Sequence, residues 1–331
     1  MTGGDALDLA GRLAMQAGLP APRDLVRLSG GKNNRVFRVG AAHVLKLYHW
    51  DERDPRDRLR AEWRFLRYAW DRGVRNIPRP LAKDDAAHAG LYTLLPGAAP
   101  AEVSAWHVAA ALDFLLAVNA APRDPAALDP GSEACFSLAE HVATIDRRVA
   151  RLGALDPAAP LHAAAQALVA ERLAPLWDRV RVSLPRGEAP LEAMARCVSP
   201  SDFGFHNALE ADGRVAFIDF EYAGSDDPAK LVCDFFCQPQ VKVPLHFMPD
   251  FTRRLIAGLG LDTAHERRCH QLLDAYRIKW ACIILNDFLP LGSSRRAHAD
   301  LARTEERCAF QLARARAKLD EIEGDPHRGV S

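Results

Sequence analysis

Two short stretches of this chain decide its fold: SPSDFGFHN at residues 199–207 and VAFIDFE at residues 215–221. They supply Asp202, then Asn207 five positions later, and Asp219 twelve positions after that. An Asp-Gly dipeptide between the stretches is a typical hairpin turn, and the second aspartate ends an apolar run. A loop that runs into a short hairpin brings these three polar side chains together.

Phosphoryl transfer from ATP to a hydroxyl needs this set of groups. One carboxylate accepts the proton of the attacking hydroxyl, while an amide oxygen and a second carboxylate hold Mg²⁺ against the phosphates. Asp202 fits the first role, and Asn207 and Asp219 fit the second. The two stretches therefore predict a kinase of small molecules that uses ATP and Mg²⁺.

Length and composition are compatible with this prediction. The chain has 331 residues, which is long for one hydrophobic core and favours two lobes. Basic and acidic side chains balance at 43 each, so no basic field exists to attract nucleic acid or an anionic membrane surface. The first twenty residues lack the basic and apolar blocks of a signal peptide, and no apolar run is long enough to span a membrane.

Seven cysteines, an odd number scattered along the chain, fit reduced thiols in a cytoplasm better than a disulfide framework. Two clusters could suggest zinc: Cys233 with Cys237, and His265 with Cys269 and His270. Their spacings match no common zinc pattern, and the second cluster lies in a charged helical segment. Structural cysteines and surface histidines are therefore the favoured interpretation, with zinc as the alternative.

The organisation of the chain changes near residue 97. Before it, strand-like runs surround one helical segment, residues 56–71, whose large apolar side chains recur at helical spacing. The strand-like runs are residues 25–28, 35–39, 42–48 and 91–95. After residue 97 helical patterns dominate, at about 102–119, 137–152, 160–181, 227–237, 247–258, 264–289 and 297–322. The last of these helices alternates charges, which indicates a solvated surface.

In this order the landmarks resemble the protein-kinase-like fold: two strands around a Gly-rich turn, a lysine strand, a glutamate helix and the Asp, Asn and Asp set. The wording DFGFHN at 202–207 and IDFEYAG at 218–224, with Asp227-Pro228 after it, is similar to the aminoglycoside phosphotransferase and choline kinase branch. The resemblance covers about residues 25–240. It implies an α+β, bilobal fold. A small N-terminal nucleotide-binding lobe with an antiparallel sheet spans residues 1–96, and a larger, mainly helical C-terminal catalytic and substrate-binding lobe spans 97–331.

The resemblance assigns the Gly-rich turn to the phosphates of ATP. Gly30 and Gly31 let backbone amides approach the phosphates, because no Cβ blocks the way. Asn33 and Asn34, in the same turn, are counted among the nucleotide-binding residues. A plain hairpin turn is the alternative, and the lysine that follows on a later strand counts against it.

That lysine is Lys46, which the resemblance places against the α- and β-phosphates and pairs with Glu62, sixteen residues later. Glu52 is a second candidate partner, in the charged approach to the helix. An ordinary exposed lysine is the alternative for Lys46, and its apolar neighbours count against that interpretation. Leu94 and Leu95 resemble the hinge between the lobes, whose backbone binds the adenine edge.

By the same resemblance Asp202 is the catalytic base, and Asn207 and Asp219 hold the magnesium ion. The alternative, a helix cap at Asp202 and a strand end at Asp219, does not explain the spacing of all three residues. Asp234 resembles the family aspartate that hydrogen-bonds the backbone of the catalytic loop. Glu221 is either a further acid of the metal site or an exposed hairpin residue.

One departure from the family pattern affects the catalytic loop. Pro200 stands where the family usually has a histidine, and Ser201 stands where glycine is common. The fixed φ of Pro200 can rigidify the backbone in place of that histidine. The departure leaves two alternatives open: a pseudokinase that binds ATP and Mg²⁺ without turnover, and a transferase of AMP on the same fold. The intact Lys46 and Asp202 count against both.

The partner predicted by the sequence is a small-molecule hydroxyl acceptor, and the oligomeric state is left open. Polycationic aminoglycosides call for a surplus of acids around the cleft. Residues 240–331 instead hold many arginines, which favours a neutral or anionic acceptor such as a sugar or a sugar acid. These arginines are Arg253, Arg254, Arg267, Arg268, Arg277, Arg295 and Arg296. Tyr276 and Trp280, with Lys279 nearby, either line a pocket or pack in the core, and core packing is favoured.

Overall fold

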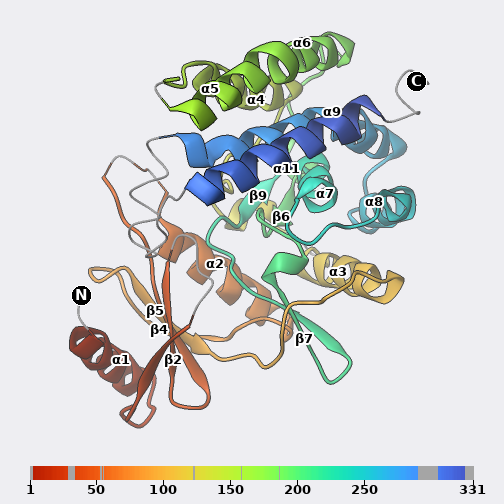
Figure 1. Cartoon of the computed structure of the whole chain (residues 1–331). Coiled ribbons are helices and arrows are strands. Elements are labelled where there is room, and N and C mark those ends of the chain that lie inside the picture. The colour runs from red at the N-terminus through yellow and green to blue at the C-terminus, as the bar shows by residue number, and fades with distance from the viewer. Residues whose placement is uncertain are drawn as a thin grey trace.

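The structure is a computed structural model, and it describes residues 3–28, 34–52, 54, 56–121, 124–157, 159–185, 187–289 and 305–324. It combines a five-stranded antiparallel sheet with two short strand pairs and many helices, so the prediction of a mixed α+β chain is confirmed. The sheet and helix α2 (Arg58–Asp71) lie at one end of the molecule, and most of the helices form the other end (Figure 1).

The sheet has the strand order β1-β2-β3-β5-β4, and every neighbouring pair is antiparallel. Its strands are β1 (Leu25–Leu28), β2 (Arg35–Val39), β3 (His43–Leu47), β4 (Pro80–Asp84) and β5 (Ala89–Thr93). Short turns join β2 to β3 and β4 to β5, and between β3 and β4 the chain forms α2. The strands predicted at 25–28, 35–39 and 42–48 are confirmed to within a residue at each end, and the one predicted at 91–95 begins at Ala89.

Alternation along β3 gives the sheet two different faces. Leu45 and Leu47 belong to an apolar cluster with helix α1 (Gly3–Gln16), which contributes Leu9 and Leu13. Lys46 lies between the two leucines in sequence, so its side chain emerges on the opposite face, toward α2. The sheet thus buries apolar side chains against α1 and presents a charged one on its other side.

Helix α2 begins at a side-chain cap, because Asp57 accepts a hydrogen bond from the Arg60 backbone N–H at 2.9 Å. Its buried face carries Phe65 and Leu66, and Glu62 lies three and four positions before them on that same face. A buried carboxylate needs a charged or hydrogen-bonding partner. The position of Glu62 in the sequence therefore demands a contact with another element.

The other end of the molecule is built from helices around a buried centre. They are α3 (Ala105–Val118), α4 (Leu138–Gly153), α5 (Pro160–Leu168), α6 (Ala174–Ser183), α7 (Pro228–Cys237), α8 (Met248–Gly258), α9 (Thr263–Ile284) and α11 (Glu305–Glu323). Every residue of α7 is buried, and α7 packs along α9, which also contacts α4, α8 and α11. Helices α7 and α9 are therefore the centre of the larger core.

Two short strand pairs pack against the helices. Strand β6 (Cys197–Ser199) pairs with β9 (Gly224–Asp226), and β7 (Ala208–Ala211) forms a hairpin with β8 (Arg214–Phe217). Strand β6 packs on α7, and β8 packs on α3. Asp212 and Gly213 form the turn of that hairpin with φ angles of +50° and +67°, as a two-residue mirror-image turn requires. The hairpin predicted from the Asp-Gly dipeptide is confirmed.

Several elements differ from the prediction. The sequence does not predict helix α1 or strand β4. Helix α1 begins with two glycines and contains a third, and β4 begins at a proline and carries charges. The single helix predicted at 160–181 is divided into α5 and α6 by a π-helical turn at Val169–Leu173. The solvated surface predicted for the last helix is wrong for one face of α11, where Leu312, Leu319 and Ile322 are buried.

Three findings on the described residues bear on the predictions about membrane spans, disulfides and zinc. No helix among them is long and apolar enough to cross a membrane. All seven cysteines lie in the described part of the chain, where they are buried and none forms a disulfide. The described residues also contain no group of three or more His, Cys, Asp or Glu side chains that could hold a metal ion.

Candidate functional site

Lys46, Glu62 and Asp219 meet on the face of the sheet that α2 covers. Lys46 Nζ lies 2.5 Å from Glu62 Oε2 and 2.5 Å from Asp219 Oδ1. Burial opposes the charge on Lys46, but the carboxylates of Asp219 and Glu62 outweigh it and raise the pKa of the ammonium. Lys46 is thus a permanent cation held between an acid of α2 and an acid that follows β8.

The carboxylate of Glu62 has a second partner in the sheet. Tyr48 donates its hydroxyl to Glu62 Oε2 at 2.8 Å, and the hydroxyls of Tyr48 and Tyr92 lie 2.7 Å apart. The buried position of Glu62 on α2 is explained by these contacts. Of the two glutamates considered from the sequence, Glu62 is the one in contact with Lys46.

Asn34 and Glu221 join the strand-rich end to the segment after Asp219. The Asn34 amide donates to Glu221 Oε2, and its Oδ1 accepts from the His49 backbone N–H at 3.2 Å. Both Asn34 and Glu221 are buried, so Glu221 is not an exposed hairpin residue as one reading of the sequence had it. Gly30, Gly31 and Asn33 lie outside the described residues.

The catalytic-loop candidates are connected through the backbone. Asn207 donates from Nδ2 to the backbone carbonyl of Asp202 at 3.0 Å. The backbone carbonyl of Asn207 accepts from the Ile218 N–H at 2.9 Å. The second bond brings Asn207 beside the residue that precedes Asp219. The carboxylate of Asp202 lies 3.3 Å from His206 Nε2 and is partly exposed.

A cluster of phenylalanines lies next to both aspartates in sequence and fixes their loops. Phe203 follows Asp202, Phe220 follows Asp219, and the two rings pack on Phe114 of α3 at centroid distances of 5.6 and 6.1 Å. Stacked and tilted rings at such distances fill a core with defined geometry. The loops that carry Asp202 and Asp219 are thereby both anchored on the same ring of α3.

The residue before Asp202 has an unusual backbone. Ser201 has a φ of +65°, in the left-handed region that favours glycine. Its N–H donates to Ser199 Oγ at 3.0 Å, and its hydroxyl accepts a hydrogen bond from Lys230 Nζ at 3.3 Å. This backbone conformation suits glycine, as the resemblance implies for this position, and the two hydrogen bonds show what holds a serine there instead.

The donors at Asn207 and Asp219 fit a magnesium ion bound with a nucleotide. Asp219 keeps 40% of its side chain exposed, and the bond from Asn207 Nδ2 to Asp202 leaves the Asn207 Oδ1 as an acceptor. Mg²⁺ is usually bound through one or two carboxylates together with substrate phosphates. This donor set, one carboxylate and one amide oxygen, matches that pattern.

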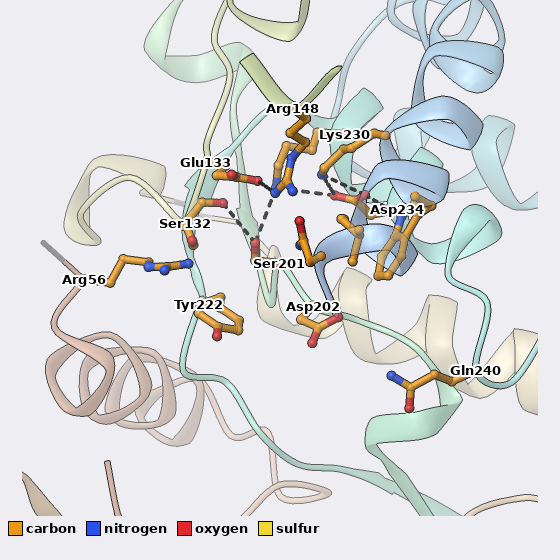
Figure 2. A pocket seen from close by; sticks show the side chains of 14 residues that line it. Arg56, Ser132, Glu133, Arg148, Ser201, Asp202, Tyr222, Lys230, Asp234 and Gln240 are labelled. Carbon is orange, nitrogen blue, oxygen red and sulfur yellow. Dashed lines mark hydrogen bonds and ion pairs between the residues drawn. The ribbon is translucent and has the colours of Figure 1, made fainter. Parts of the chain in front are cut away.

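A cavity of about 240 Å³ opens beside Asp202 (Figure 2). Its wall carries the acidic side chains of Glu133, Asp202 and Asp234 and the basic side chains of Arg56, Arg148, Lys230 and Lys279. Trp280 belongs to the buried core and also lines this cavity, and Lys279 is buried on the same wall, so both of the roles considered from the sequence apply to Trp280. Tyr276 does lie in the core, where its hydroxyl is 2.7 Å from His141 Nδ1.

Asp234 makes different contacts from those that the resemblance implies. Its carboxylate accepts two hydrogen bonds from Lys279 Nζ and one from the Trp280 indole, each at 2.9 Å. Lys230 Nζ lies 3.5 Å from Asp234 Oδ2. Among the described residues its partners are thus side chains of the cavity wall, and the predicted bond to the catalytic-loop backbone is wrong.

The arginines on which the acceptor prediction rested do not line this cavity in the described part of the chain. Arg253 and Arg254 bind Asp250 at the surface, and Arg268 binds Asp227. Arg295 and Arg296 lie outside the described residues. The cavity is lined by different cations, and the sequence spacing could have pointed to one of them. Lys230 lies four positions after Asp226 and four before Asp234, a spacing that favours ion pairs along a helix. Arg148 had no such signal.

The hinge candidates lie directly after β5. The Leu94 N–H already donates to the Ala42 carbonyl at 2.8 Å, so it is not available to an adenine edge. Leu95 follows it with a half-buried side chain. Beyond these residues, Gly97 has a φ of +119°, and a Cβ there would lie 2.6 Å from the Glu210 carbonyl oxygen, so glycine is required where the chain passes β7.

Comparisons with known proteins agree with this architecture. The sequence profile of the phosphotransferase enzyme family matches residues 24–267, well over half of the chain. Comparison with curated protein sequences gives no significant match.

Three solved structures illustrate the likeness in fold. A choline/ethanolamine kinase family protein from Mesorhizobium loti is 22% identical, with a TM-score of 0.58 over 96% of this chain and 100% of its own. A spectinomycin phosphotransferase in complex with ADP and spectinomycin is 13% identical, with a TM-score of 0.60 over 92% of this chain and 98% of its own. A macrolide 2′-phosphotransferase from Brachybacterium faecium is 19% identical, with a TM-score of 0.53 over 89% and 96%.

At these identities the solved structures establish the fold alone, and the predicted protein-kinase-like fold is confirmed. The family profile goes further, because it spans the sheet, the catalytic-loop candidates and the first part of α9. This chain belongs to the phosphotransferase enzyme family.

Proposed function

We propose that this protein is an ATP-dependent kinase that transfers the γ-phosphate of ATP to a hydroxyl of a small molecule, such as a sugar, an amino alcohol or a related metabolite. One observation carries the proposal. The Lys46–Glu62–Asp219 cluster and the Asp202–Asn207 loop are joined by the Ile218–Asn207 backbone bond beside a cavity that Asp202 lines. Family membership supports a phosphotransferase activity.

The nucleotide contacts follow from the charges in place. Lys46 offers a permanent cation to the phosphates, and Glu62 keeps its side chain oriented toward them. Gly30, Gly31 and Asn33 belong to the proposed phosphate loop, with Asn34 anchoring its end through Glu221. The backbone of Leu94 and Leu95 is proposed for the adenine, through the Leu95 N–H or a carbonyl, since the Leu94 N–H is taken.

Asn207 and Asp219 are proposed to hold Mg²⁺, which when bound neutralises charge on the phosphates. In the transfer, the acceptor oxygen forms a bond to the γ-phosphorus while the bond to the β–γ bridging oxygen breaks. The bridging oxygen leaves with its electron pair as part of ADP. Asp202 takes the proton of the acceptor hydroxyl, and its partly exposed carboxylate on the cavity wall is accessible for that role.

Two further proposals come with this function. Residues 1–96 form the nucleotide-binding lobe and residues 97–331 the catalytic and substrate-binding lobe, with the division at Gly97. The protein works in the cytoplasm, which is supported by seven buried cysteines without a disulfide.

The test is a screen of hydroxyl compounds with ATP and Mg²⁺, in which products are resolved by mass. A gain of one phosphate on the acceptor, with ADP formed in equal amount, is expected. A gain of AMP would show a transferase of AMP instead. Tight binding of ATP and Mg²⁺ without any product would favour the pseudokinase.

A further inference from the structure

Three buried cations gather on one wall of the cavity beside Asp202. They are Lys230 of α7, Lys279 of α9 and Arg148 of α4, and each is at least nine-tenths buried. Figure 2 shows Arg148, Glu133, Lys230 and Asp234 close together, with Ser201 between this group and Asp202. Three helices that are far apart in sequence thus deliver positive charge to one place.

Every acid near these cations is already paired. Lys230 Nζ lies 2.6 Å from Asp226 Oδ2, Lys279 donates to both oxygens of Asp234, and Arg148 donates from Nη2 to Glu133. The acids are therefore committed to side chains of the protein. A cationic group that entered this part of the cavity would have to compete with these side chains for Asp226, Asp234 and Glu133.

Arg148 retains hydrogen-bond donors that the protein does not use. A guanidinium carries five N–H groups in a fixed fork that matches a carboxylate or a phosphate. The described residues give its Nε no hydrogen-bond partner, although this atom is buried. Arg148 lines the cavity, so a carboxylate or a phosphate bound there can accept from guanidinium N–H groups that the protein leaves unused. Arg148 is therefore suited to an anionic ligand.

The cation cluster and the proposed base share a direct connection. Lys230 donates to Ser201 Oγ at 3.3 Å, and Ser201 precedes Asp202. An acceptor that fills the cavity can thus contact the cations at one end and Asp202 at the other. Its volume of about 240 Å³ is below the ~300–1,000 Å³ of pockets for drug-sized ligands, which favours an acceptor of monosaccharide size or smaller.

We propose that the acceptor carries an anionic group, a carboxylate or a phosphate monoester, which Arg148 binds while Asp202 faces the hydroxyl to be phosphorylated. This proposal rests on the proposed kinase function and narrows its acceptor class. It assigns recognition of the acceptor's negative charge to Arg148 of the cavity wall and not to the surface arginines of residues 240–331.

The first experiment compares acceptors that share a carbon skeleton and differ in the charge of one substituent. One series is glucose, glucosamine, glucuronate and glucose 6-phosphate, and the other is glycerol, serinol, glycerate and glycerol 3-phosphate. We expect kcat/KM to be at least tenfold higher for an acid than for the neutral and amino members of its series. The carboxylates and the phosphate esters distinguish the two anionic groups. Preference for a neutral or an amino compound would overturn the proposal.

The second experiment changes Arg148. Arg148→Gln should raise KM for the preferred acid roughly 10–100-fold, the usual effect of losing a hydrogen bond to a charged group. It should leave KM for ATP unchanged, which also shows that the variant folds. Arg148→Lys, which keeps the charge, should recover part of the loss. The control is Arg147→Gln, on the same helix but exposed and bonded to Thr144. An equal effect of Arg148→Gln on acids and neutral acceptors would contradict the assignment.

Binding separates the failure of this proposal from the failure of the kinase function. The four acids are titrated calorimetrically into wild type and Arg148→Gln, with ADP and Mg²⁺ present to occupy the nucleotide site. Binding of an acid that depends on Arg148, without any turnover, would keep the anion site and overturn the kinase function. Lack of binding by all four acids would overturn the anion site, whatever the kinase assay shows.

Discussion

Ser201 and Asp219 both have backbone φ angles in the left-handed region, +65° and +67°. For residues other than glycine this conformation costs on the order of 1 kcal/mol or more. It persists only where surrounding contacts determine it, and at Ser201 these are the bonds to Ser199 and Lys230. The proposed base Asp202 thus follows a strained residue, and the proposed metal ligand Asp219 is itself strained, a property that the sequence motifs do not reveal.

Asp202 is the residue whose substitution tests the proposed chemistry most directly. Asp202→Asn keeps the shape of the side chain and removes the base, so turnover should fall roughly 10²–10⁴-fold with ATP affinity nearly unchanged. Steady-state kinetics and nucleotide titration measure the two quantities. Asp212→Asn, at the exposed hairpin turn, is the matched control and should retain full activity. Equal turnover in Asp202→Asn and wild type would show that the base has been wrongly assigned.

Asp219 carries the proposed metal ligand. Asp219→Ala should abolish the dependence of nucleotide binding on Mg²⁺, because the remaining amide oxygen of Asn207 is a weak ligand alone. Calorimetric titration of ATP with and without Mg²⁺ checks this. Unchanged affinity for ATP in the presence of Mg²⁺ would exclude Asp219 from the site.

Lys46 should act on the nucleotide and not on the acceptor. Lys46→Ala should raise KM for ATP or lower kcat, since the phosphates lose their buried cation, while the KM of the acceptor stays close to the wild-type value. The control is Lys83→Ala in β4, where the lysine binds only the neighbouring exposed Asp85 in the described structure. If acceptor binding is lost and ATP binding persists, the role of the sheet has been misassigned.

At the scale of elements, one buried ion pair joins α4 to the start of α7. His141 Nε2 lies 2.9 Å from Asp227 Oδ2, and Asp227 also caps α7 by accepting from the Ala229 N–H at 2.7 Å. Burial opposes the charged imidazole, yet hydrogen bonds to Asp227 and Cys135 raise the pKa of His141 to about 9. Correspondingly, His141 and Arg268 lower the pKa of Asp227 despite its burial.

This pair predicts how stability depends on pH. The folded-state pKa of His141 lies above the ordinary value of 6.5, so its contribution is complete below pH 6.5 and is lost as the pH rises through about 9. The free energy of unfolding should fall by up to roughly 3 kcal/mol across that window. Urea unfolding at several pH values measures it, with His141→Gln as the variant that should lose the dependence. A wild-type stability that rises between pH 6.5 and 9 would contradict the pairing.

The elements that the sequence could predict are those with a local signature. Residues 35–39 and 43–47 alternate around a tight turn, and Asp227-Pro228 announces the start of α7. The π-helical turn at Val169–Leu173 has no such signature, because an uninterrupted helix has the same apolar spacing. Likewise, the buried pairing of Arg148 depends on a loop residue, Glu133, whose position is set only by tertiary structure.

For the whole molecule, α11 closes the larger core by packing on α9. Leu319 of α11 is fully buried, so Leu319→Ala should lower the free energy of unfolding by roughly 2–5 kcal/mol. Phe310→Ala removes a larger side chain from the same helix, but one that is 62% exposed, and should cost less than roughly 0.5 kcal/mol. Denaturant unfolding of both variants makes the comparison. Equal losses would mean that α11 does not pack as described.

The Asp, Asn and Asp set and the Lys46–Glu62 pair could be predicted because each motif has a fixed place in an ordered series of elements. The cavity could not, since its wall combines α4, α7 and α9 with the segment after β6. The packing of these helices decides which cations line the cavity. A count of charges along residues 240–331 therefore pointed to arginines that do not line it in the described structure.

Helix α1 is made by the ribosome well before the surface that it covers. Its Leu13 packs in one cluster with Leu91 of β5, and the two residues are 78 positions apart. At a synthesis rate of roughly 5–20 residues per second, β5 is synthesised about 4–16 s after α1. During that time the apolar face of α1 has no strand β5 to pack against. While the strands of the sheet are still being translated, the apolar face of α1 on the nascent chain is therefore open to chaperone binding and to self-association.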